Sequence, residues 1–390
     1  MKIIHTSDWH LGNMLYGYDR LASEKAFLRQ LKDIVAKEQP DCMIVGGDVY
    51  NLSAPSANVQ KIYTNAMLDI HNACKEMTIV VTAGNHDSPA KLEIDSSLWS
   101  CFNVFVVGKI EKQDDKEDYA KHIIEIKDKD GQLTGYVAAV PHFYVRNHPD
   151  FFEGLQQYII NINERNLPVI LCCHLAVSGS EIKSKSKHVQ DMEFYPLESL
   201  GDVYSYIALG HIHFAQTLSN SEGKARYCGS PISVSFNEQY PHSVTVIEID
   251  KNKQTQIRTI EIQDDMPLKT VPSESKDVEE VYTYVQEHKE ELKNCFLRFN
   301  VRVEDFLPSD SKDKSAKLCS EIGAYFCTFN IERKEIPTEN TKSRIITAEE
   351  LKQLTPMDIA KDYMARKGMV LSEDFMQMIR QAMEFKSEED

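Results

Sequence analysis

The sequence predicts a layered α/β domain, followed by a small α/β domain and C-terminal helices. Short apolar runs with the length of buried strands recur through the first 265 residues. Amphipathic segments with helical spacing lie between some of these runs, and strands that alternate with helices are typical of a layered α/β fold. The chain has 390 residues, which is too long for one ordinary domain.

Six apolar runs predict the buried strands of the first domain, which we place at residues 1–265. The runs cover residues 2–6, 42–45, 78–82, 135–140, 169–173 and 204–209. A helix is expected over residues 59–70, because apolar side chains recur there at i, i+3 and i+4 spacing. Residues 243–250 alternate between apolar and polar side chains, which predicts a half-buried strand.

Residues 266–337 form a second predicted domain with the order helix, strand, helix, strand. The expected helices cover residues 277–292 and 315–326, and the expected strands cover 296–303 and 328–334. Residues 336–341 have the composition of a linker.

The last segment, residues 338–390, is predicted to contain two short helices. Thr355-Pro356 is typical of a helix start, and Ser372 offers a second N-cap. Six of the 13 methionines lie between residues 357 and 383. Two short helices cannot bury such apolar faces against each other alone, so they dock either on this chain or on a partner.

Charge and cysteine content limit the classes of function. The net charge is −16, and both residues 1–265 (−10) and residues 266–390 (−6) are acidic. Such a balance argues against a chain that binds nucleic acid tightly on its own. The nine cysteines form no CxxC motif, and no signal peptide or membrane-spanning apolar run is found. These features predict a cytoplasmic protein with free thiols and no membrane contact.

Polar side chains follow five of the predicted strands, at the point where each strand ends. The groups are Asp8-x-His10, Gly47-Asp48, Gly84-Asn85-His86-Asp87, His174 and Gly210-His211-x-His213. The carboxyl ends of strands in an α/β sheet are where ligands bind, so these side chains are expected to share one cleft. The glycines allow sharp turns and a close approach of the backbone to a ligand.

Two carboxylates, one amide and four imidazoles are too many ligands for one tetrahedral metal. The set suits two metal ions with one bridging carboxylate, which together activate water and clamp a phosphoryl group. Oxygen and imidazole ligands without thiolate favour manganese or a similar divalent ion. Cys172 and Cys173 adjoin His174, but we expect both to be buried in the core rather than to bind metal.

The five groups together resemble the calcineurin-like metallophosphoesterase superfamily. The segments Thr6–Gly12, Gly84–Asp87, Gly210–His213 and Gly229–Pro231 narrow the resemblance to the SbcD family. Its members are nuclease subunits of bacterial SbcCD complexes and counterparts of the Mre-eleven nuclease. The resemblance implies a four-layer fold, in which a β-sandwich is flanked by helices, with a small cap domain and C-terminal helices.

The resemblance also implies a role for each matching residue. The first metal would be held by Asp8, His10 and His213, and the second by Asn85, His174 and His211, with Asp48 as the bridge. His86 would be the catalytic histidine, and Asp87 would hold the His86 imidazole in one tautomer. Archaeal relatives carry a second histidine three residues after the bridging aspartate, where this chain has Asn51.

The implied activity is manganese-dependent cleavage of DNA by an exonuclease and hairpin endonuclease, in repair and recombination. The implied partner is an SbcC-type SMC-like ATPase that binds the C-terminal helices, and the implied assembly is a homodimer within a nucleoid-associated heterotetramer. Residues 266–337 would bind DNA as a cap, and helices near residues 59–70 and 92–99 would make the dimer contact. The lysine-rich loop 182–188 and Tyr18-Asp19-Arg20 are candidates for gripping phosphate.

Two other functions remain open from the residues alone. A small-substrate phosphodiesterase or nucleotide phosphatase would share the site but would not need the second domain. A non-catalytic scaffold would keep the fold without its ligands, although all seven candidate ligands are present. The two divalent ions would neutralise part of the acidic charge, so weak DNA binding that depends on metal and partner is expected.

Overall fold

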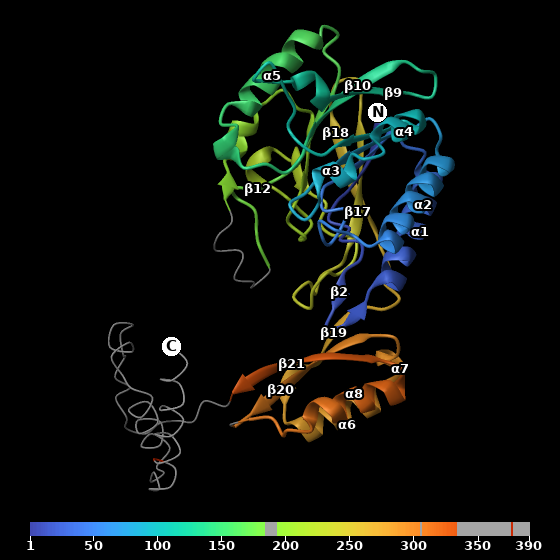
Figure 1. Cartoon of the computed structure of the whole chain (residues 1–390), viewed down its shortest axis with the longest axis vertical. Coiled ribbons are helices and arrows are strands. Elements are labelled where there is room, and N and C mark those ends of the chain that lie inside the picture. The colour runs from blue at the N-terminus through green and yellow to red at the C-terminus, as the bar shows by residue number, and fades with distance from the viewer. Residues whose placement is uncertain (184–192, 305, 334–375, 377–390) are drawn as a thin grey trace, which may run out of the picture. The chain divides into compact units, whose positions relative to one another are not determined.

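Two six-stranded sheets form the body of the protein in the computed structural model, which describes residues 1–183, 193–304, 306–333 and Met376 (Figure 1). The first sheet has the order β18 (Thr255–Glu261), β17 (Ser243–Ile249), β1 (Lys2–Thr6), β4 (Cys42–Gly46), β5 (Thr78–Thr82) and β6 (Val104–Val107). The second has the order β15 (Gln216–Thr217), β16 (Ala225–Tyr227), β14 (Tyr206–Gly210), β11 (Val169–His174), β10 (Leu133–Val140) and β9 (Ile123–Lys127).

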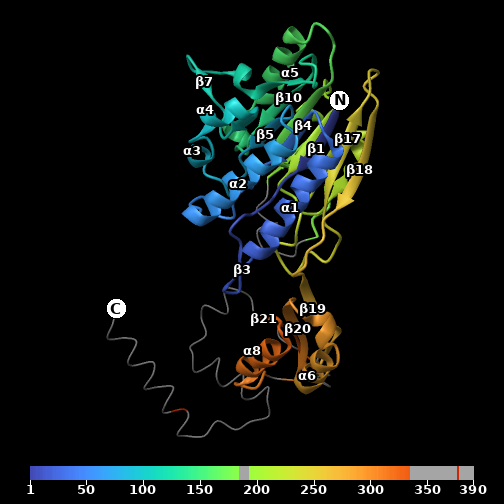
Figure 2. The same cartoon turned by 90° about the vertical axis from the view of Figure 1, so that its right-hand side faces the viewer.

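The two sheets pack against each other, and helices cover their outer faces. Alternation along β4 shows the arrangement, because Ile44 belongs to the cluster between the sheets while Met43 and Val45 belong to the cluster under the helices. The first sheet is covered by α1 (Leu21–Glu38) and α2 (Ala57–Ala73), and the second by α5 (Phe151–Ile162) (Figure 2). The predicted four-layer α/β fold is therefore confirmed.

Shorter elements complete the first domain. Three two-stranded pairs are formed by β2 (Met14–Leu15) with β3 (Tyr18–Asp19), β7 (Lys112–Gln113) with β8 (Lys116–Glu117), and β12 (Ala176–Val177) with β13 (Phe194–Tyr195). The segment expected as one helix near residues 92–99 contains two single-turn helices, α3 (Pro89–Leu92) and α4 (Ser96–Trp99). The strand predicted over 204–209 begins at Tyr206 and includes Gly210.

A separate three-stranded parallel sheet forms the second domain. Its strands are β19 (Leu268–Lys276), β20 (Phe296–Val303) and β21 (Tyr325–Arg333), in that order. The helices are α6 (Val278–Glu287), α7 (Lys289–Leu292) and α8 (Ser311–Ile322). Their apolar faces pack on the sheet in one cluster around Val281, Leu297 and Phe299.

The structure differs from three sequence predictions in this domain. Strand β19 was not predicted, because it contains Pro272 and four polar residues after it, which is unusual for a strand. The helix expected over 277–292 ends at Glu287 and a separate turn begins at Lys289. The helix expected over 315–326 ends at Ile322, because Gly323 adopts the left-handed conformation that closes helices, and Tyr325 and Phe326 belong to β21.

Arg20 joins the two domains rather than facing a substrate. Its side chain is buried, its Nη2 donates to Asp264 Oδ2 at 2.7 Å, and its guanidinium carbon lies 4.9 Å from the Phe296 ring centroid. Tyr18 also packs edge-on against Phe296. The prediction that Arg20 grips phosphate is therefore wrong, because the group is desolvated and already paired.

Residues Met1–Lys334 form one compact unit that contains both sheets of the body and the second domain. The predicted boundaries after residues 265 and 337 stay predictions. The C-terminal helices expected within 338–390 and the lysine-rich part of the loop 182–188 lie outside the described residues, apart from Met376, Ile182 and Lys183.

Candidate metal centre

The five strand-end groups meet at one edge of the two sheets. Strands β1, β4 and β5 run parallel in the first sheet, and β11 and β14 run parallel in the second, so their carboxyl ends lie on the same side. Four of the candidate ligands adopt positive φ angles, namely Asp8 (54°), His10 (46°), Asp48 (50°) and His211 (92°). Non-glycine residues hold this conformation only where the surrounding structure enforces it, as is common at functional sites.

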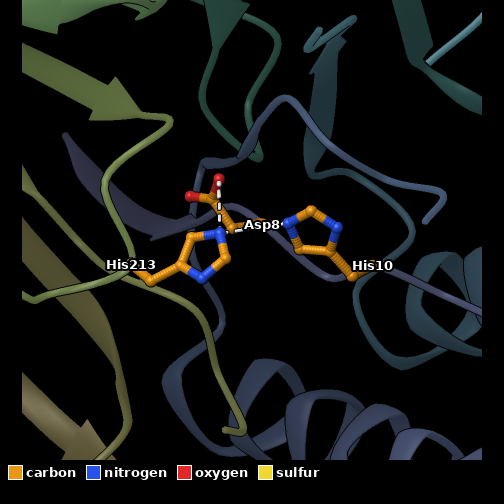
Figure 3. Close-up of side chains that lie close together, drawn as sticks. All are labelled: Asp8, His10 and His213. Atoms are coloured by element: carbon orange, nitrogen blue, oxygen red, sulfur yellow. Dashed lines mark hydrogen bonds and ion pairs between the residues drawn. The ribbon is translucent and has the colours of Figure 1, made fainter. Parts of the chain in front are cut away.

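One group of candidate ligands consists of Asp8, His10 and His213 (Figure 3). The Nε2 atoms of the two histidines face each other at 3.1 Å, and Nε2 of His213 lies 3.8 Å from Asp8 Oδ1. Asp8 and His10 are almost fully buried, and Nδ1 of His10 has no hydrogen-bond partner. A carboxylate and two imidazoles that converge in this way are a suitable ligand set for a divalent ion.

A second group consists of Asn85, His174 and His211. Oδ1 of Asn85 lies 3.1 Å from Nε2 of His174 and 2.9 Å from Nδ1 of His211. The two imidazole nitrogens are 3.3 Å apart. Nδ1 of His174 donates to the Gly46 carbonyl oxygen at 2.7 Å, which leaves Nε2 directed at the other ligands.

Asp48 lies between the two groups. Its Oδ2 atom is 3.6 Å from His10 Nε2 and 3.4 Å from His174 Nε2, so one carboxylate oxygen faces an imidazole of each group. This is the placement expected of a carboxylate that bridges two ions. The structure thus brings all seven predicted ligands into one cluster, although their roles as ligands stay a prediction.

Close backbone contacts require two of the glycines that the sequence singled out. A Cβ atom on Gly84 would lie 2.1 Å from Asp48 Oδ1, and one on Gly47, whose φ is +91°, would lie 2.2 Å from His174 Nδ1. Both positions let the backbone of one metal loop touch a ligand from another loop.

His86 is exposed beside the first group, with its ring centroid 4.9 Å from that of His10. Its Nδ1 lies 3.1 Å from the Asn51 carbonyl oxygen, so the backbone of residue 51 orients the ring. The structure differs here from the role expected for Asp87, whose oxygens accept instead from the backbone N–H groups of Val49, Tyr50 and Gly84. A carboxylate occupied by three buried N–H donors fixes the loops around Asp48 rather than the His86 imidazole.

Comparison with known families agrees with this geometry. A profile of the calcineurin-like phosphoesterase family matches residues 1–215, which is more than half of the chain. The chain belongs to this family. Calcineurin-like phosphoesterases use divalent metals, and the aspartates and histidines described above are groups that could hold such ions.

Similar proteins from three bacteria are each described as the SbcD component of the SbcCD nuclease. The chain is 29% identical to the one from Rhodobacter capsulatus over 64% of this chain and 66% of that protein. It is 27% identical to the one from Bacillus subtilis over 79% and 80%, and 32% identical to the one from Escherichia coli over 63% and 65%. The chain therefore spans just under two thirds of the length of the Rhodobacter and Escherichia relatives.

The electrostatics of this phosphoesterase site separate its histidines into two kinds. Burial and neighbouring imidazoles lower the pKa of His10 and of His211 to about 3, so both rings are neutral and carry a lone pair. Burial also opposes protonation of His174 and His213, but the carboxylates of Asp48 and Glu238 respectively raise the pKa of each ring to about 9. Burial would raise the pKa of Asp48, yet the adjacent His174 holds it below its usual range.

Two residues of the site were missed by the sequence analysis. Glu238 accepts from Nδ1 of His213 at 3.0 Å and from the Val234 backbone N–H at 2.9 Å. The ring of His142 lies with its centroid 6.1 Å from those of His174 and His211. Pro141-His142 follows the predicted strand 135–140 as the other groups follow theirs, whereas only the fold could identify Glu238, which lies in a loop.

The donor set fits divalent ions better than a thiolate-bound metal. His10 Nδ1 is buried without a partner, and the ligand atoms of each carboxylate–histidine group lie within 4.8 Å of one another. Cys172 and Cys173 belong to the clusters on opposite faces of β11, and burial raises the pKa of the Cys172 thiol to about 12. The expectation that both cysteines are buried in the core is confirmed.

Among the described residues, no helix combines the length and the apolar character needed to cross a bilayer.

Proposed function

We propose that the chain is a manganese-dependent phosphodiesterase that cleaves DNA. The observation that carries the proposal is the position of Asp48 Oδ2, which faces His10 of one ligand group and His174 of the other. Two ions bound there would activate the attacking water and neutralise charge on the phosphate. The similarity to proteins described as components of a nuclease favours DNA as the substrate.

The chain's own residues would divide the remaining tasks. Asp8, His10 and His213 would hold one ion, Asn85, His174 and His211 would hold the other, and Asp48 would touch both. His86 stands beside this cluster on the solvent side, with Nδ1 engaged by the Asn51 carbonyl. Its Nε2 is thereby left to meet the phosphate or to protonate the leaving oxygen, which is the task of a general acid.

The test is metal-dependent cleavage of linear duplex, single-stranded and hairpin DNA by the purified chain. Cleavage with Mn²⁺ that stops on chelation and returns on metal addition is the expected result. Metal analysis after manganese loading should give about two ions per chain. No cleavage of any DNA by the loaded protein would contradict the proposal.

A small-substrate phosphoesterase is the second candidate, because the ligand cluster alone would suit it. A nitrophenyl phosphodiester assayed beside DNA separates the two. Fast turnover of the small ester without DNA cleavage would favour the second candidate. The second domain favours DNA, since a small ester has no need of an additional folded unit anchored through Arg20 and Phe296.

We also propose that the chain acts with an SMC-like ATPase, because its relatives are described as one component of a two-part SbcCD nuclease. Deletion of residues 345–390 should abolish association with that ATPase and retain metal-dependent cleavage of simple substrates. The homodimer and the cytoplasmic, nucleoid-associated location belong to the same proposal. Exposed Ile94 and Leu98, beside the buried Trp99, support an apolar contact near the predicted dimer helices.

A further inference from the structure

Three side chains of one loop form a continuous row that leads away from the metal centre. The loop follows β10, and the ring of His142 adjoins those of His174 and His211. The ring centroid of Tyr144 lies 5.6 Å from that of His142. The guanidinium carbon of Arg146 lies 5.1 Å from the Tyr144 ring centroid.

The backbone holds this row in place beside the metal loops. The His142 N–H donates to the Ala83 carbonyl oxygen at 2.8 Å, directly before the segment Gly84–Asp87. Phe143 points the other way and packs against Phe151, with ring centroids 5.5 Å apart. The loop is therefore anchored at both its backbone and its core side, while Tyr144 remains 56% exposed and Arg146 is exposed.

The row ends at the opposite side of the cluster from His86. The His86 ring adjoins His10 of the first ligand group, whereas the His142 ring adjoins the second group. Among the described residues, the ring nitrogens of His142 have no hydrogen-bond partner, so the ring can donate to an additional ligand. A polymeric substrate whose scissile phosphate sits over both groups must continue past one side or the other.

The chemistry of the row matches a nucleotide. An exposed tyrosine ring stacks on bases of any sequence, and a neighbouring arginine neutralises phosphate. An isolated exposed cation–π pair needs no such position. In a chain with a net charge of −16, an arginine next to the site also supplies the positive charge that a polyanion requires.

We propose that His142, Tyr144 and Arg146 bind the nucleotide adjacent to the scissile phosphate, on the His174–His211 side of the metal centre. His142 donates to the phosphate, Tyr144 stacks on the base, and Arg146 pairs with the next phosphate. This proposal rests on the proposed DNA cleavage and names the path of the strand through that site.

The experiment compares kcat/KM for a single-stranded oligonucleotide with kcat/KM for a nitrophenyl phosphodiester, and takes the ratio. Tyr144→Ala should lower this ratio by about 10-fold, and Tyr144→Phe, which keeps the ring, should leave it near the wild-type value. Arg146→Ala should reduce the slope of log KM against log salt by roughly 0.7. Arg165→Ala is the matched control, because Arg165 is exposed before β11, at the opposite end of that strand.

The outcomes separate this proposal from the proposed function. A wild-type protein that hydrolyses the small diester but no oligonucleotide would overturn the proposed function. A wild-type protein that cleaves the oligonucleotide, with Tyr144→Ala and Arg146→Ala unchanged in ratio and salt slope, would overturn the nucleotide path and leave DNA cleavage standing. Turnover of the small diester reports whether each variant is folded.

Discussion

Oε1 of Glu238 lies 3.0 Å from Nδ1 of His213, on the side of the imidazole that faces away from Asp8 and His10. Glu238 is itself held by the Val234 N–H and by the hydroxyls of Ser230 and Ser235. A buried carboxylate that fixes the tautomer of a metal-binding histidine directs its other nitrogen at the ion. The loop after Gly229 thus supports the ligand set without contributing a ligand.

Glu238→Gln should therefore weaken manganese binding by about 10-fold to 100-fold, because the amide no longer secures the His213 tautomer. Titration calorimetry with Mn²⁺ measures the effect directly. Glu222→Gln makes the same chemical change at a side chain that is 88% exposed, and should leave manganese affinity unchanged. Equal affinities for the two variants would show that Glu238 has no part in metal binding.

His86→Ala should lower the rate of DNA cleavage by about 10²-fold to 10⁴-fold, the usual contribution of a general acid. Manganese content should remain that of the wild type, since seven other side chains form the ligand cluster. Both the cleavage rate and the metal content are measured on the same preparation. Cleavage at the wild-type rate, or loss of metal together with activity, would contradict the assigned role.

Manganese affinity should increase with pH between about pH 6 and pH 8.5, with release of protons on binding. The sign follows from the raised pKa of His174 and His213, which is about 9 for each. Both rings hold a proton at neutral pH in the metal-free chain, and an ion must displace it. Calorimetry in buffers with different ionisation enthalpies counts the released protons, and a pH-independent affinity would rule out this competition.

Arg20→Ala should lower the free energy of unfolding by about 3–5 kcal/mol, because it leaves the Asp264 carboxylate without its buried partner. Adding Asp264→Ala should recover part of this loss, since the unpaired charge is then removed. Urea denaturation measures both variants. Arg165→Ala, at an exposed arginine, should change stability by less than about 0.5 kcal/mol.

Much of the site could be predicted because its residues follow strands that are recognisable from their apolar runs. The order Asp8, Asp48, Asn85, His174 and His211 along the chain identified both the fold class and the ligand cluster. Arg20 could not be assigned in the same way. In the sequence it follows the first metal motif like a phosphate-binding arginine, and only the fold shows that Asp264 and Phe296 bury it.

The same limit applies to Asp87 and Asn51. A carboxylate next to His86 in the sequence suggested a direct hydrogen bond, but the turn at Gly84 directs Asp87 towards the backbone of Val49 and Tyr50. The His86 ring is held instead by a backbone carbonyl of residue 51, and a carbonyl oxygen is present whatever the side chain. Residue identity therefore carried no signal for this contact.

The sequence by itself determined the strands, the residues at their carboxyl ends and hence the family, because apolar periodicity and local motifs are properties of short segments. Only the tertiary structure decided which groups orient those residues: Glu238 for His213, Asn51 for His86, and the loop of His142 beside the second ligand group. These contacts join segments far apart in the chain. Their geometry depends on how two sheets pack, which no local pattern encodes.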